Sequence, residues 1–345
     1  MQGSTYYNIL DDPAVSKWIN RFVSPATRKT YLHRLSQFFK YLNEEKKLNV
    51  TPMQAVKENF EFVKNAEDPF QMGKYTDLLN EFLNSKLLRG KSNSYKASYA
   101  RAISSFFKKN NSTLIGEINI PLRDMPYPKL YLKLEDLKTV LKEFKEPSKT
   151  CILCLLYTGM RVEEFLSLTK ARLQLTPAPD TILIPLRKTG KLGRARITGE
   201  TYTFLGGVAY EKLKMHLTDK TEDEPIFPIK VRTLQYNFVK AAMNAGLLTI
   251  TEKRTPSGRK VWSVLYNGNQ VFTDAHPFHP HALRSLFKTE ASHLGIPEEI
   301  SEFWMGHAGG IRRVYDARDV THIEDFIIHY RKLTNHFDGV LKEVV

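Results

Sequence analysis

Residues 158–168 read TGMRVEEFLSL and directly follow the apolar run KTCILCLLY at 149–157. The apolar run predicts a fully buried helix, and Gly159 can end that helix in a left-handed conformation. Arg161 then begins another helix, with an apolar side formed by Val162, Phe165 and Leu168. A guanidinium at this helix start adds to the positive end of the helix and suits a phosphate. The ordinary structural alternative is an ion pair between Arg161 and Glu164, three residues on.

A second segment, PHALRSLFK at 280–288, has the pattern of a helix that starts at its first residue. Proline suits the first helical turn, and Gly295 with Pro297 marks the end of the element. Helical spacing places three basic side chains on one face, namely His281, Arg284 and Lys288. Such a face is either solvated surface or a candidate site, and a histidine and an arginine that share a helix start favour a site.

A third segment is WMGH at 304–307, followed by Tyr315 within the run RRVYDARD. The arginines around this tyrosine are Arg312, Arg313 and Arg318. Nearby positive charge favours the phenolate, so Tyr315 is expected to ionise more readily than a free phenol. The alternative is a half-buried tyrosine that anchors a helix by its ring.

The run TILIPLRKTGKLGRARIT at 181–198 predicts two short strands around a turn that contains Gly190 and Gly193. It has no acidic residue, and its basic residues are Arg187, Lys188, Lys191, Arg194 and Arg196. The predicted hairpin is therefore a local concentration of positive charge.

Two stretches before these motifs, at 25–43 and 93–109, predict amphipathic helices. Their apolar stripes are Thr27, Tyr31, Leu35, Phe38 and Leu42 in the first, and Tyr95, Tyr99, Ile103 and Phe106 in the second. Between Lys86 and Asn110 the chain has seven basic residues and no acidic one. This region is either an ordinary solvated helix face or a surface that binds an anion.

Three prolines in NIPLRDMPYPKL at 119–130 predict an extended connector, because proline restricts its neighbour and cannot donate a hydrogen bond. We therefore expect a helical domain at 1–118, a linker at 119–130 and a second domain at 131–345. The second domain is predicted to be mainly α with small β-hairpins. Its further expected elements are a helix near Leu134, helices at 208–217 and 231–246, a hairpin within 249–278, and helices from His279 almost to the end.

The 345 residues suit two domains, and the net charge of +14 favours a polyanionic partner. Charge alone does not separate DNA, RNA and anionic lipid from mere solubility. Cys151 and Cys154 both lie in the apolar run, so neither a disulfide framework nor a cysteine-based zinc site is expected. We find no membrane-length apolar run and no signal-peptide pattern, and we expect a cytoplasmic, nucleoid-associated protein, in the host cytoplasm if a virus or mobile element encodes it.

The second domain resembles the catalytic domain of the tyrosine site-specific recombinases of the phage-integrase type. The resemblance rests on five motifs that occur in the family's order, namely TGMRVEEFLSL, RKTGK at 187–191, HALR at 281–284, GH at 306–307 and Tyr315. Each motif is weak alone, and the order makes the resemblance specific. The two basic helices before the connector are similar to the small DNA-gripping domain of that family. The chain departs from the family pattern in the long interval between Arg161 and His281, where 249–278 is the expected insertion.

The resemblance implies a role for each matched residue. Tyr315 would attack a DNA phosphate, Lys188 would be the general acid with Lys191 as the alternative, and His281 would assist proton transfer. Contacts to the phosphate would come from Arg161, Arg284 and His307, while Glu164 would orient the site. Further DNA contacts are expected from Arg28, Arg34, Lys96, Arg101, Lys108, Lys191 and Arg194.

The resemblance also implies double-stranded DNA at specific sites as the partner, a homo-tetramer on two duplexes, and no cofactor or metal. His276, His279 and His281 form a possible zinc set, but the intervening prolines and the absence of nearby cysteine disfavour it. Two other functions fit the same residues, a type IB topoisomerase and a non-catalytic DNA-binding regulator. The amphipathic helix at Thr321–Phe337 either packs on a neighbouring protomer or closes the core of its own chain.

Overall fold

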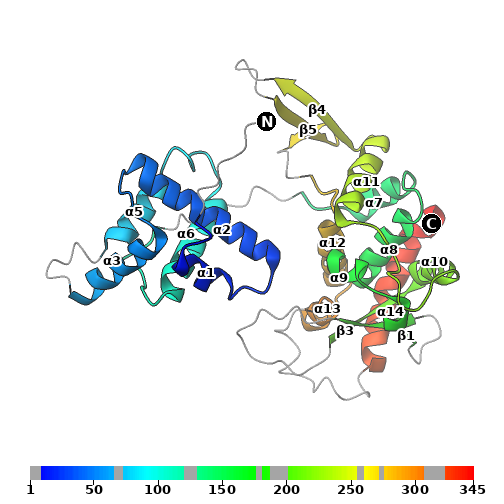
Figure 1. The fold of residues 1–345 in the computed structure, drawn as a ribbon. Helices are drawn as coiled ribbons and strands as arrows, with labels where there is room; N and C mark the ends of the chain where they lie inside the picture. Colours follow the sequence, from blue (N-terminus) through cyan, green and yellow to red (C-terminus); the bar gives the residue numbers. More distant parts are fainter. Residues whose placement is uncertain are drawn as a thin grey trace. The chain divides into compact units, whose positions relative to one another are not determined.

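The computed structural model describes residues 9–65, 73–119, 130–175, 181–186, 201–254, 260–271, 276–306 and 323–345. These residues form two compact units, unit 1 within Met1–Pro128 and unit 2 within Lys129–Val345 (Figure 1). Unit 1 is helical in its described part, whereas unit 2 combines helices with two small antiparallel sheets. The prediction of a mainly α fold with small sheets is confirmed. None of the described helices has the length and apolar character needed to cross a membrane.

Unit 1 consists of α1 (Pro13–Ile19), α2 (Pro25–Lys40), the π-helical turn η1 (Tyr41–Glu45), α3 (Pro52–Asn65), α5 (Lys74–Leu83) and α6 (Asn93–Lys109). Serine side chains cap its two predicted helices. Ser24 accepts a hydrogen bond from the amide of Thr27 at 3.4 Å, and Ser92 accepts one from the amide of Tyr95 at 3.2 Å. The predicted helix at 93–109 is confirmed, and the one at 25–43 is α2 continued by η1.

The apolar stripes of α2 and α6 face each other in the core of unit 1. Leu35, Phe38 and Leu42 from α2 and η1 are fully buried with Ile103 and Phe106 of α6. Tyr95, the first residue predicted for the α6 stripe, remains 39% exposed at its edge. The stripes therefore pack inward, and the cations Lys40 of α2 and Arg101 and Lys108 of α6 stay exposed.

Unit 2 has eight helices of at least one turn in its described part: α7 (Leu134–Leu141), α8 (Ser148–Thr158), α9 (Val162–Leu166), α10 (Gly207–Leu217), α11 (Val231–Asn244), α12 (Pro280–His293), α13 (Glu298–Trp304) and α14 (Ile323–Leu341), besides the short η2 (Lys170–Arg172) and η5 (Lys342–Val344). Every residue of α8 from Thr150 to Thr158 is buried, so the predicted buried helix is confirmed. The helix ends at Gly159, whose φ of +61° is left-handed as predicted.

The first sheet has the strand order β1 (Gln174–Leu175), β2 (Thr181–Leu186) and β3 (Thr201–Gly206). The first predicted strand is confirmed as β2, but its partner is β3, with Thr181 opposite Gly206 and Leu186 opposite Thr201. The second strand predicted within the run 181–198 falls at 187–198, which lies outside the described residues. Phe204 and Leu205 are neighbours in β3, and both are fully buried in the core. This strand is therefore marked by burial on both of its faces and not by an alternation of apolar and polar residues.

The second sheet, β4 (Leu248–Arg254), β5 (Lys260–Tyr266) and β6 (Asn269–Val271), confirms the hairpin predicted within 249–278 and adds a short third strand. Leu248 of β4 and Val264 of β5 are buried, and β4 packs on α11. The hydroxyl of Tyr266 donates to the carboxylate of Asp136 on α7. In Figure 1 the strands β4 and β5 extend away from α11.

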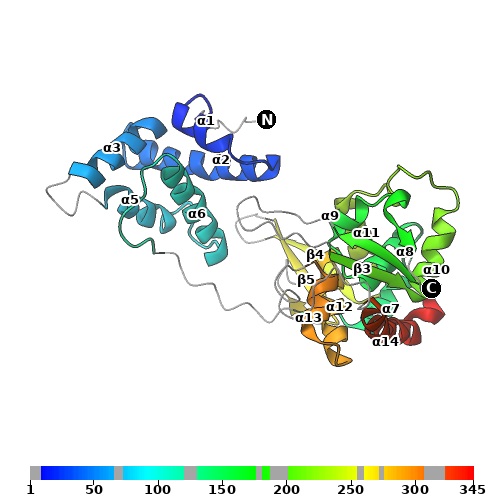
Figure 2. The same cartoon turned by 90° about the horizontal axis from the view of Figure 1, so that it is seen from below.

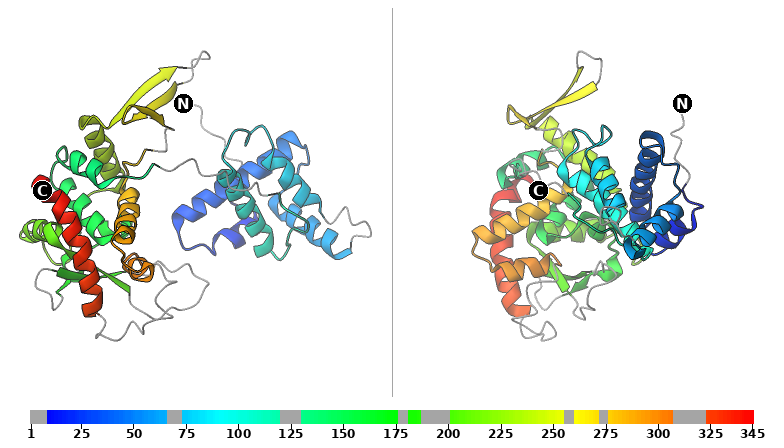
Figure 3. Two further views of the ribbon diagram at one scale, coloured as in Figure 1. Left: turned by 180° about the vertical axis from the view of Figure 1, so that it is seen from behind. Right: turned by 90° about the vertical axis from the view of Figure 1, so that its left-hand side faces the viewer.

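Helix α14 runs along unit 2 beside α10 and β3 (Figure 3, left). Tyr330, Leu333, Phe337 and Leu341 are completely buried in the core of the same unit. The carboxylate of Asp338 accepts hydrogen bonds from the hydroxyl of Tyr157 at 2.7 Å and from the amide of Val208 at 3.1 Å. The apolar face of this helix therefore closes the core of its own chain.

Candidate active site

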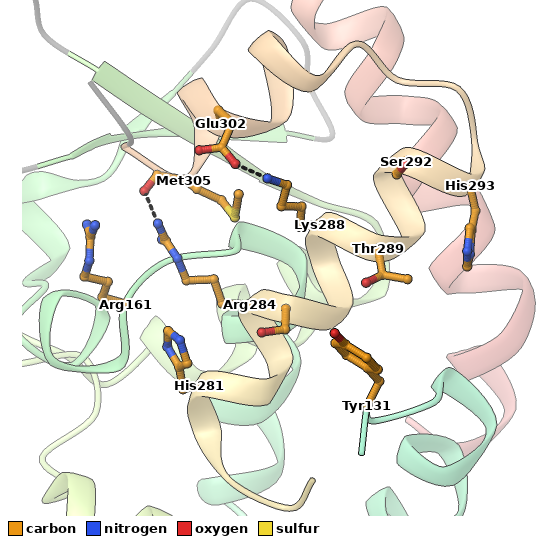
Figure 4. Close-up of a pocket in the computed structure, with 11 residues that line it drawn as sticks. Tyr131, Arg161, His281, Arg284, Lys288, Thr289, Ser292, His293, Glu302 and Met305 are labelled. Atoms are coloured by element: carbon orange, nitrogen blue, oxygen red, sulfur yellow. Dashed lines mark hydrogen bonds and ion pairs between the residues drawn. The ribbon is translucent and has the colours of Figure 1, made fainter. Parts of the chain in front are cut away.

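A cleft of about 610 Å³ lies where the start of α9 meets α12 and the end of α13. Figure 2 shows α12 and α13 next to each other in unit 2, and Figure 4 shows their side chains in the cleft. The lining residues that bear on its chemistry are Arg161, His281, Arg284, Lys288, Glu302 and Met305. The motifs TGMRVEEFLSL and HALR, far apart in the sequence, thus meet at one place.

The guanidinium of Arg284 is fixed by main-chain carbonyl groups. Its Nη1 donates to the oxygen of Gly159 at 2.7 Å, and its Nη2 donates to the oxygen of Met305 at 2.6 Å (Figure 4). The residue is 5% exposed, although arginine is rarely buried this deeply. Because its donors already have acceptors on two elements, the side chain is held in one orientation.

Gly159 serves this arrangement in two ways. Its left-handed backbone turns the chain at the end of α8, so that its carbonyl oxygen reaches Arg284. A Cβ atom at this position would lie 2.7 Å from the Cδ1 atom of Phe287 on α12. The close approach of the two helices therefore requires glycine here.

Arg161 precedes the first turn of α9, as predicted, and its side chain is 39% exposed toward the cleft. Its Nη1 lies 4.0 Å from the Oε2 atom of Glu164, whose side chain is only 8% exposed. The structural alternative, an ion pair with Glu164, is thus present together with a position in the cleft. The largely buried carboxylate of Glu164 lies on one side of the guanidinium, and an orienting role for it stays a prediction.

The surroundings of Arg284 disfavour its positive charge. Burial is the main cause, and the positive charge of Arg161 acts in the same direction, so that the pKa of Arg284 falls to about 10. The charges of Glu164 and Glu302 oppose this shift. Arg284 is still a cation at neutral pH, and an anion that entered the cleft would stabilise both arginines.

His281 lies at the first turn of α12, exposed on the wall of the cleft. The preceding His279 caps that helix, because its Nδ1 atom accepts a hydrogen bond from the amide of Ala282 at 3.1 Å. The two imidazole rings are nearly parallel, with centroids 6.4 Å apart. Among the residues that the structure describes, no group of three or more His, Cys, Asp or Glu side chains is placed to bind a metal ion.

Tyr330 lies on α14, fifteen residues after the predicted nucleophile Tyr315. It is completely buried, and its hydroxyl donates to the main-chain oxygen of Tyr157 at 2.9 Å. Burial raises the pKa of Tyr330 far above its usual value. A buried, un-ionised phenol that already donates its proton to a carbonyl cannot attack a substrate in the cleft.

Several predicted site residues lie outside the described ranges, namely Lys188, Lys191, Arg194, His307 and Tyr315. Gly306, which directly precedes His307, follows the end of α13.

The predicted DNA contacts of unit 1 are not equivalent. Arg28 is half-buried and its Nε donates to the carbonyl of Phe22, and Arg34 lies over the ring of Tyr99 at 5.8 Å. On α6, Lys96 is half-buried, and Arg101 and Lys108 are exposed. Of these five cations, the three on α6 are the better placed to meet a polyanion.

Sequence reasoning missed part of the cleft. The carbonyl oxygens of Gly159 and Met305 bind Arg284, but a main-chain acceptor leaves no signal in residue type. Glu302 was not singled out, although it contacts Lys288 in the cleft (Figure 4). The sequence signal for this part of the cleft was the helical spacing that places Lys288 on the same face as Arg284.

No known protein-family profile matches the sequence, and no curated protein matches it. Solved structures match the fold. The XerH site-specific recombinase bound to its difH substrate is 19% identical with a TM-score of 0.50, over 87% of this chain and 78% of that one. A lambda integrase dimer bound to a COC′ core site is 13% identical with a TM-score of 0.51, over 89% of this chain and 98% of that one. The chain therefore has the fold of the tyrosine site-specific recombinases.

Proposed function

We propose that this protein is a site-specific DNA recombinase that cleaves and rejoins strands through a 3′-phosphotyrosyl intermediate. The observation that supports it best is the meeting of Arg161 and Arg284 in one cleft, where the charge of Arg284 is disfavoured in the absence of an anion. A phosphodiester is an anion whose two non-bridging oxygens suit two guanidinium groups. The fold shared with the XerH recombinase and lambda integrase structures supports the same proposal.

In the proposed reaction the hydroxyl oxygen of Tyr315 attacks the phosphorus atom and the bond to the 5′-oxygen breaks. His281 helps to remove the tyrosine proton, and Lys188, with Lys191 as the alternative, gives a proton to the departing 5′-oxygen. The products are a 3′-phosphotyrosyl bond and a free 5′-hydroxyl. Because the bond energy is kept in the covalent intermediate, attack by another 5′-hydroxyl rejoins the strand without ATP.

Arg161, Arg284 and His307 would bind the non-bridging oxygens, where negative charge builds up in the transition state. Fixed donors in such a site contribute about 3 to 4 kcal/mol each to the lowering of the barrier. The two carbonyl contacts of Arg284 hold its guanidinium within the protein itself, so little reorganisation is needed when the charge develops.

We further propose that residues 1–118 grip DNA, that 119–130 link the domains, and that 131–345 form the catalytic domain. Lambda integrase also has a solved structure as a tetramer bound to a Holliday junction, with a TM-score of 0.51 and 13% identity over 89% of this chain and 79% of that one. This supports a homo-tetramer on two duplexes as the assembly of the present protein. Its site of action would be the cytoplasm in which its DNA lies.

The test uses a pool of short suicide duplexes of randomised sequence, each with a nick beside one fixed phosphodiester. After cleavage the short 5′-hydroxyl fragment diffuses away, so a covalent protein–DNA adduct accumulates and survives SDS. Sequencing of the trapped DNA then defines a selected duplex. We expect an adduct with the wild type, and with Tyr315→Phe we expect binding of the selected duplex without any adduct.

Three results would contradict the proposal in different ways. Binding of DNA without an adduct from any duplex would identify a non-catalytic regulator on the same fold. An adduct that Tyr315→Phe retains would place the nucleophile elsewhere. Relaxation of supercoiled plasmids without sequence preference by a monomer would identify a topoisomerase.

A further inference from the structure

Next to the Arg284 contact, α12 and α13 are joined a second time through Lys288. The ammonium group of Lys288 donates to the carboxylate of Glu302 and, at 2.9 Å, to that of Glu298. The two carboxylates differ in burial, because the side chain of Glu302 is 20% exposed and that of Glu298 is 74% exposed. The contact with Glu302 is therefore the better shielded from water and salt.

The two contacts run side by side between the same helices. Arg284 and Lys288 are four residues apart on α12, and Glu302 and Met305 are three apart at the end of α13, so each pair lies on one helix face. Figure 4 shows the Lys288–Glu302 and Arg284–Met305 contacts as neighbours in the cleft. The main-chain acceptor of Arg284 therefore lies one helical turn from the carboxylate that holds Lys288.

Helix α13 is held in unit 2 by its buried side chains Phe303 and Trp304, and the contact between Lys288 and Glu302 adds a polar tie at the same end. It has seven residues, and a helix of that length is not stable by itself in water. Its last turn carries the Met305 oxygen that accepts from Arg284 at 2.6 Å. A shift of this turn would move the acceptor, and the Arg284 guanidinium with it.

The geometry points to Lys288 and Glu302 as positioning residues that hold the end of α13 on α12 and so fix the guanidinium of Arg284. This inference rests on the proposed function for its effect on cleavage. Glu302 binds the ammonium of Lys288, so Lys288 acts within the protein and is not a ligand of the DNA phosphate.

The test is a double-mutant cycle of wild type, Lys288→Met, Glu302→Gln and the double variant. Single-turnover adduct formation is measured at saturating selected duplex, and DNA affinity is measured with the same duplex. We expect each single variant to cleave about tenfold more slowly or worse, with affinity unchanged within about twofold, because misplacement of a catalytic group costs rate. The cleavage rate of the double variant should stay within about twofold of the rate of the slower single variant, because both changes break the same contact.

Glu298→Gln is the matched control, because Glu298 binds the same ammonium from a more exposed position. It should leave the cleavage rate within about twofold of wild type, as exposed ion pairs contribute little. Cleavage by Glu302→Gln at the wild-type rate, or losses that multiply in the double variant, would overturn the inference. So would weaker DNA binding by Lys288→Met with stronger binding by Glu302→Gln, which would identify Lys288 as a DNA ligand.

A measurement without DNA keeps this inference separate from the proposed function. Arg284 is 5% exposed and should resist phenylglyoxal in the wild type, as read by peptide mass spectrometry. In Glu302→Gln we expect Arg284 to be labelled, while Glu298→Gln should keep it protected. Unchanged protection of Arg284 in Glu302→Gln would overturn the inference whether or not the wild type cleaves DNA. Absence of a wild-type adduct alone would count only against the proposed function.

Discussion

The Nη1 group of Arg284 donates to the carbonyl oxygen of Gly159, across 2.7 Å and between two motifs that are far apart in the sequence. The end of the most deeply buried helix of unit 2 therefore sets the place of a cleft arginine. Any change that moves the end of α8 also moves this acceptor. The folding of the core and the geometry of the site are thus coupled at one residue.

Replacement of Gly159 tests this coupling. Gly159→Ala brings a Cβ atom to 2.7 Å from Phe287 at a φ of +61°, whereas Gly295→Ala meets nothing within 4 Å at a φ of +69°. Left-handed strain alone costs about 1 kcal/mol, and an added clash in a packed core costs about 1 to 3 kcal/mol more. Urea titration followed by near-ultraviolet circular dichroism should therefore show a clearly larger loss of unfolding free energy for Gly159→Ala. Equal losses would mean that the contact with Phe287 relaxes freely.

The basic face of α6 is predicted to bind DNA without regard to sequence. Arg101→Ala and Lys108→Ala remove exposed cations, and each should reduce the slope of log affinity against log salt concentration by about one. Arg34→Ala is the matched comparison, because this side chain already lies over the ring of Tyr99. We expect it to change the salt slope less, as measured by fluorescence anisotropy at several salt concentrations. An equal change in slope for all three variants would place Arg34 on the DNA as well.

Tyr330 gives a prediction in alkaline solution. Its pKa is raised by burial, so the folded protein keeps this proton above pH 10 while the unfolded chain loses it. The stability that this difference provides is complete below about pH 10 and decreases by up to about 1.4 kcal/mol per pH unit above it.

Tyr330→Phe removes both the titration and the hydrogen bond to Tyr157. At pH 8 the variant should be less stable by about 1 kcal/mol, the typical contribution of one hydrogen bond. The gap to wild type should narrow as the pH rises from 10 to 11, as measured by urea unfolding at each pH. Parallel curves for the two proteins would show that Tyr330 ionises equally in the folded and unfolded states.

Much of the fold can be predicted because its signals are local. The stripes of α2 and α6, the buried run of α8 and the Gly159 turn all follow from spacing or residue type within one element. The strand β3 was not predicted, because its burial depends on packing against α8 and α13, which lie far from it in the sequence. Local alternation does not carry that information.

The candidate site also has features that local sequence signals predict and others that depend on tertiary packing. Spacing alone places His281, Arg284 and Lys288 on one face of α12, and the structure agrees. It cannot tell that the acceptors of Arg284 are carbonyl groups, nor that Lys288 binds Glu302, because these contacts arise only when α12 packs on α8 and α13. Residue type indicates which groups carry charge, and tertiary packing decides which charges meet.

Helix α14 supplies Tyr330, Leu333 and Phe337 to a core that also contains α8 and β3. During synthesis on the ribosome, the helices of unit 1 emerge first, and all the residues of their hydrophobic core lie within that unit. Unit 2 remains incomplete until α14 has been translated as far as Leu341, because Tyr157 and Val208 bind Asp338 of that helix. A nascent chain interrupted before α14 would therefore contain the complete core of unit 1 and an unfinished core of unit 2.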